Sequence, residues 1–76
     1  MLINNNNGTF AVEIRIAEEI TFSDRVEAMR QWLDHQRIEP TTFRGKFDRQ
    51  PIIIRVEFAV HADAVAFAEA FGGQVR

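Results

Sequence analysis

The stretch that most constrains this chain is residues 50–60, where three consecutive isoleucines are followed by alternating apolar and charged side chains. Successive side chains of a β-strand point to opposite faces of a sheet. One face of this strand is therefore apolar, whereas the other carries Ile53, Arg55 and Glu57. The pattern predicts a central strand in a sheet that helices cover on one face only.

Residues 10–17 also alternate, which predicts a second strand with one buried face. Its polar face carries Glu13 and Arg15, and its apolar residues share the opposite face: Phe10, Val12, Ile14 and Ile16. The preceding residues 1–8 contain a run of asparagines, whose side chains compete with regular backbone hydrogen bonding. We therefore expect a flexible lead-in at residues 1–8 and a single α+β domain at residues 9–76.

A helix is predicted from about residue 24 to residue 36, with Thr21 or Ser23 as its side-chain cap. Its apolar residues recur at helical spacing, at Val26, Met29 and Leu33. Trp32 lies about 90° from that stripe, so we expect it at the boundary of the core and partly exposed. The helix should end near Arg37, because Pro40 bars its continuation.

Residues 41–47 predict an edge strand that forms a hairpin with the central strand. Phe43 and Phe47 are expected to point inward, with Gly45 marking a bulge or a close approach of a helix. A second helix is predicted at residues 61–71, and Gly72 follows it in the manner of a helix terminator. Residues 74–76 are long enough only for a stub of strand.

The element order is β-α-β-β-α with a final β stub. Right-handed crossovers and helices on one face predict a ferredoxin-like sandwich, with an antiparallel sheet whose last strand is short or absent. The expected strand order is stub, first, third, second. Because like charges placed opposite each other destabilise a strand pair, Glu13 should pair with Arg55 and Phe10 with Phe58.

Composition limits the chemistry. The chain has 76 residues, no cysteine and a net charge of −2, so disulfides and thiolate metal sites are excluded. No apolar run approaches the length of a membrane span, and no signal peptide is evident. These features predict a cytoplasmic protein. Lys46 is the only lysine among nine basic residues, a bias that GC-rich bacterial coding produces.

No residue pattern predicts an enzyme, a cofactor site or a metal site. His35 and His61 each lack a second ligand at metal-binding spacing, and a site needs several convergent ligands. The adjacent carboxylates Glu18 and Glu19 fall in a loop without apolar surroundings that would raise a pKa. There is no glycine-rich loop that opens a helix to cradle a phosphate.

We therefore expect a small non-enzymatic interaction domain. It would form a homodimer or bind another protein through the uncovered sheet face or the edge of the first strand, which a short last strand leaves open. One alternative is nucleic-acid binding through the basic hairpin at residues 42–55, and another is small-ligand sensing at a dimer interface. The candidate contact residues are Arg15, Trp32, Arg44, Lys46, Arg49, Ile53 and Arg55.

Overall fold

The computed structural model describes residues 8–48 and 50–75. Nearly all of the predicted lead-in at residues 1–8 lies outside these residues. The elements follow one another in the order β1 (Phe10–Ile16), the short 3-10 turn η2 (Glu19–Thr21), α1 (Phe22–Gln36), β2 (Thr42–Lys46), β3 (Ile52–Phe58), α2 (His61–Phe71) and β4 (Gln74–Val75).

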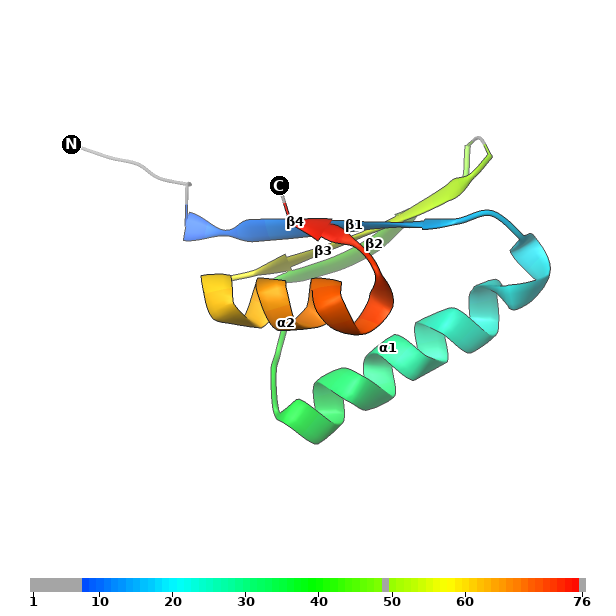
Figure 1. Cartoon of the computed structure of the whole chain (residues 1–76). Helices are drawn as coiled ribbons and strands as arrows, with labels where there is room; N and C mark the ends of the chain where they lie inside the picture. Colours follow the sequence, from blue (N-terminus) through cyan, green and yellow to red (C-terminus); the bar gives the residue numbers. More distant parts are fainter. Residues whose placement is uncertain (1–7, 49, 76) are drawn as a thin grey trace.

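The predicted α+β class, with an antiparallel sheet and two helices, is confirmed. The four strands lie in the order β2-β3-β1-β4, and each neighbouring pair is antiparallel. Both helices lie on the same side of the sheet, and neither covers the opposite face (Figure 1). The C-terminal stub is a strand of two residues that pairs with Val12 and Glu13 of β1.

The register between β1 and β3 is the one predicted from charge. Glu13 lies opposite Arg55, and Phe10 lies opposite Phe58. The alternative, in which Glu13 would face Glu57, would bring like charges together. Hydrophobic and electrostatic patterns therefore agree on one register, in which the alternate apolar residues of the two strands face each other on the helix side, from Phe10 opposite Phe58 to Ile16 opposite Ile52.

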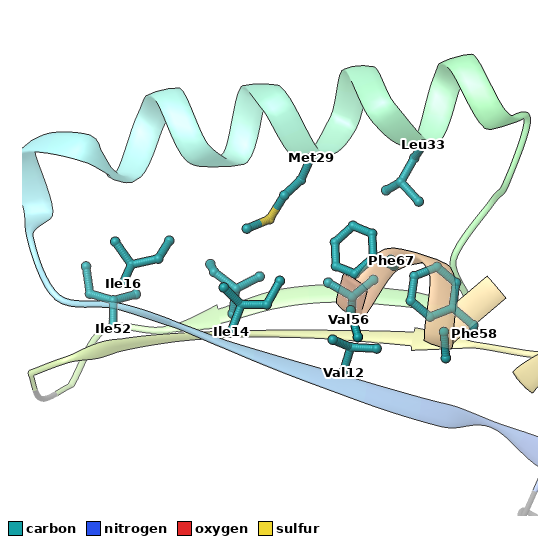
Figure 2. Close-up of a cluster of buried hydrophobic side chains, with 12 residues drawn as sticks. Val12, Ile14, Ile16, Met29, Leu33, Ile52, Val56, Phe58 and Phe67 are labelled. Carbon is teal, nitrogen blue, oxygen red and sulfur yellow. The ribbon is translucent and has the colours of Figure 1, made fainter. Parts of the chain in front are cut away.

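The core lies between the sheet and the two helices. Met29 and Leu33 point from α1 toward the sheet, and Phe67 enters from α2 (Figure 2). Phe67 is fully buried and packs against Phe58 and Phe71, with ring centroids 5.3 and 5.0 Å apart. Burial of such a side chain stabilises the fold by roughly 1.5–3 kcal/mol.

The ends of the helices differ in part from the expectation. Thr21 is the N-cap residue of α1, but its hydroxyl donates to the carbonyl oxygen of Glu18 and makes no capping hydrogen bond, so the predicted side-chain cap is wrong. Thr21 belongs to the preceding 3-10 turn and has helical backbone angles, whereas the side chain of a capping residue normally projects from an extended backbone. Arg37 and Gly72 end the two helices in the left-handed conformation, near the predicted positions.

Phe43 and Phe47 behave differently from each other. Phe43 packs against the core as predicted, whereas Phe47 is 62 % exposed, so its expected burial is wrong. The ring of Phe47 folds back over Gly45 and stacks edge-to-face on Phe22, with centroids 5.1 Å apart. β2 pairs with β3 without a bulge, and the close approach at Gly45 comes from Phe47 and Ile54 rather than from a helix.

Candidate interaction surface

The face of the sheet opposite the helices, which we call the open face, is polar and strongly charged. The alternation of the strands that fixes the core residues on one side fixes these residues on the other. The open face carries four cationic and two anionic side chains among the described residues: Arg15, Arg44, Lys46, Arg55, Glu13 and Glu57. It therefore has a positive charge, although the whole chain has a net charge of −2.

Arg55 is the centre of an ion-pair triad on this face. Its Nη1 lies 2.8 Å from a carboxylate oxygen of Glu13, and its Nε lies 3.1 Å from a carboxylate oxygen of Glu57. The hydrogen bond to Glu57, followed by that to Glu13, raises the pKa of Arg55 above its ordinary value, although partial desolvation opposes the shift. Both carboxylates of the open face are thus engaged by one arginine.

The other three cations have no such compensation. Arg15, Arg44 and Lys46 are exposed and form no ion pair within the described ranges. Arg44 lies directly opposite Arg55 in the β2–β3 register, a placement of like charges that destabilises a sheet when it is not neutralised. The open face therefore offers guanidinium and ammonium groups to an anionic partner.

An apolar residue lies among these cations. Ile53 is half-buried, and in the registers of β3 it faces Arg15 on one side and Lys46 on the other. A hollow of about 450 Å³ is lined by Ile53 together with Glu13, Arg44, Lys46 and Arg55. A central apolar contact with charged surroundings resembles the usual division of a protein interface into a core and a polar rim.

Five of the seven predicted contact residues therefore share one surface: Arg15, Arg44, Lys46, Ile53 and Arg55. Trp32 does not join them, because it lies on the helix side, where its ring packs edge-to-face on Phe67 and Phe71 at 5.6 and 6.0 Å. Trp32 is only partly buried, at the boundary of the core, as predicted. Arg49 lies outside the described residues.

Three features were missed from the sequence. Arg25 reaches across the fold and donates from Nη2 to the carbonyl oxygen of Phe71 at 3.4 Å, a contact between residues 46 positions apart that no local pattern signals. Ile20 is 85 % exposed in the 3-10 turn, and Phe47 is exposed at the hairpin end. The charged tip of the hairpin, where Lys46 and Asp48 flank Phe47, is the signal that could have placed this ring near solvent.

Within residues 8–48 and 50–75, no group of three or more histidine, aspartate or glutamate side chains could hold a metal ion. None of the helices in the same ranges is long and apolar enough to cross a membrane. Comparison with protein-family models, with curated proteins and with solved structures finds no match.

Proposed function

We propose that this chain is a non-enzymatic interaction domain that binds a protein partner through the open face. The observation that carries the proposal is the set of three unpaired cations around Ile53 on a face that no helix covers. We also assign the fold to the ferredoxin-like arrangement, which the order of the elements and the strand order support.

The charge of the open face favours a partner other than a second copy. In a symmetric face-to-face dimer, the same positive surface would meet itself, and like charges across an interface oppose association. An acidic protein surface would instead find cations for its carboxylates and Ile53 for an apolar side chain. Arg55 would contribute less, because Glu13 and Glu57 already occupy its guanidinium.

Site-specific photo-cross-linking in the cells that naturally make this protein tests the proposal. A photoreactive phenylalanine analogue replaces Ile53 in one variant and the exposed Ala28 of α1, on the helix side, in a matched control. We expect a light-dependent covalent adduct only from position 53, and we expect it to disappear when Arg44 and Lys46 are both changed to glutamate. The adduct mass tells a second copy from another protein. Equal adducts at both positions, or none at position 53, would refute the proposal.

Nucleic-acid binding through the hairpin is a second candidate, which the exposure of one aromatic ring favours. Phe47 is 62 % exposed and directly follows the unpaired Lys46, and aromatic rings beside cations are what single-stranded nucleic acids bind. Fluorescence anisotropy with a labelled single-stranded oligonucleotide at low salt tests it. Binding that weakens in Lys46→Gln and in Phe47→Ser would support this candidate, and no binding at low salt would exclude it.

A further inference from the structure

A groove of about 610 Å³ runs beside the part of β1 that β4 leaves unpaired. β4 pairs only with Val12 and Glu13, whereas β1 continues to Ile16. On this side, residues 14–16 have no partner strand within the described part of the chain, and we call them the uncovered edge of β1. The unpaired backbone of a strand is a template on which an extended peptide can add.

Two arginines line this groove from opposite sides of the sheet. Arg15 projects from the open face, and Arg25 of α1 lies on the helix side. The one hydrogen bond of Arg25 is long, at 3.4 Å to the carbonyl oxygen of Phe71, and its Nε is buried without an acceptor. A buried donor without a partner is unfavourable, so a carboxylate that engaged this guanidinium and let it reorient would relieve that deficit.

The remaining lining residues indicate what kind of ligand fits. Glu13 is the only carboxylate among them, against the two arginines, and Arg55 offsets part of its charge at 2.8 Å. The groove is therefore positively charged. Its partly exposed apolar residues are Pro51, Ile53 and Phe71. The combination selects a ligand that is extended, acidic and partly apolar.

We propose that the uncovered edge of β1 binds an extended acidic segment of a partner protein, which adds as a strand and places adjacent carboxylates at Arg15 and Arg25. Successive side chains of an added strand point to opposite faces of the sheet, so neighbouring positions reach the two arginines. This inference rests on the proposed function, since it specifies one kind of protein partner.

A synthetic peptide probes the edge directly. The probe is a fluorescein-labelled peptide with blocked ends, in which two adjacent glutamates are flanked by valines, and the control carries glutamines in their place. By fluorescence anisotropy, we expect the glutamate peptide to bind about tenfold more tightly, as charge-assisted hydrogen bonds predict. The Arg25→Lys variant should bind the glutamate peptide about tenfold more weakly, because lysine keeps the positive charge but lacks the two parallel N–H donors of a guanidinium group. Circular dichroism confirms that this variant is folded.

N-methylated peptides test strand addition independently of any variant. A strand that pairs on one edge donates only every second N–H group to its neighbour. Methylation of one alternate set of amides should therefore abolish binding, and methylation of the other set should leave it intact. The inference would be overturned if the two sets of methylated amides weakened binding equally. It would also be overturned if the glutamine peptide bound as tightly as the glutamate peptide, or if two copies of this chain formed a dimer that the peptide cannot dissociate.

The outcomes also separate this inference from the proposed function. Arg44 lies on the open face and does not line the groove, so Arg44→Thr should change peptide affinity by less than about twofold, as expected for an exposed charge outside the site. A lost peptide signal with an intact cross-link from position 53 would refute the edge site alone. Peptide binding without that cross-link would refute the open-face proposal alone.

Discussion

The substitution Gly73→Ala, which adds a single methyl group, is the most direct test of how the C-terminal strand packs on β1. A Cβ on Gly73 would lie 2.7 Å from Cγ1 of Ile14, 2.8 Å from Cγ1 of Val12 and 3.0 Å from the carbonyl oxygen of Glu13. Two of these atoms belong to buried core side chains and the third to the backbone of β1, so none can yield freely. Gly73→Ala must therefore push β4 away from β1.

The expected loss of stability follows from the cost of overpacking, which is typically about 1–3 kcal/mol. A chain of 76 residues has a total free energy of unfolding of only ~4–11 kcal/mol, so this loss is a substantial part of it. Since each 1 kcal/mol shifts the Tm of a small domain by about 4–8 °C, Gly73→Ala should melt about 4–24 °C lower.

Thermal unfolding followed by far-UV circular dichroism measures this difference. Gly8→Ala is the matched control, because a Cβ on Gly8 would meet no atom within 4 Å. The Gly8→Ala control should have the same Tm as the unsubstituted protein. If Gly73→Ala also melted at that temperature, the close seating of the C-terminal strand on β1, and with it one wall of the groove, would be refuted.

Three further substitutions test the core and the surface. Phe67→Ala should destabilise the chain by about 3–5 kcal/mol in urea titrations, because it empties a fully buried site that packs on Phe58 and Phe71. Phe47→Ser should change the free energy of unfolding by less than about 1 kcal/mol in the same assay, since the ring is mostly exposed. Arg44→Thr should change the free energy of unfolding by less than about 1 kcal/mol in the same assay, because Arg44 is exposed and Glu13 and Glu57 already neutralise the like charge of Arg55 opposite it.

The arrangement of the sheet could be predicted from the sequence because several signals agreed. Alternation in β1 and β3 fixed which residues face the helices, and the pairing of Glu13 with Arg55 selected the register that the structure shows. The C-terminal ends of both helices could also be predicted, since Pro40 and Gly72 limit how far each helix can extend. At these positions the local conformational preferences and the packing of the whole domain favour the same structure, and structure can be predicted from sequence where the two agree.

What could not be predicted depends on contacts between distant parts of the chain. The exposure of Phe47 follows from its place past the last residue of β2, where its one aromatic neighbour among the described residues is Phe22. The partly exposed boundary position of Trp32 was predicted, but its ring contacts with Phe67 and Phe71 of α2 require knowledge of how the two helices pack. The contact of Arg25 with the end of α2 has no sequence signal at all, because it joins elements that only the fold brings together.

The cost of keeping three unpaired cations on one face supports a binding role over simple solubility. An uncovered sheet face stays soluble with charges of mixed sign, so a solubility role alone does not require an excess of one sign. Here both carboxylates of the face pair with Arg55, whereas Arg15, Arg44 and Lys46 form no ion pair, and the four cations exceed the two carboxylates by two charges. An anionic partner would turn that repulsion into attraction. The same side chains should therefore lower the stability of the free domain and raise the affinity of its complex, a trade-off common at functional sites.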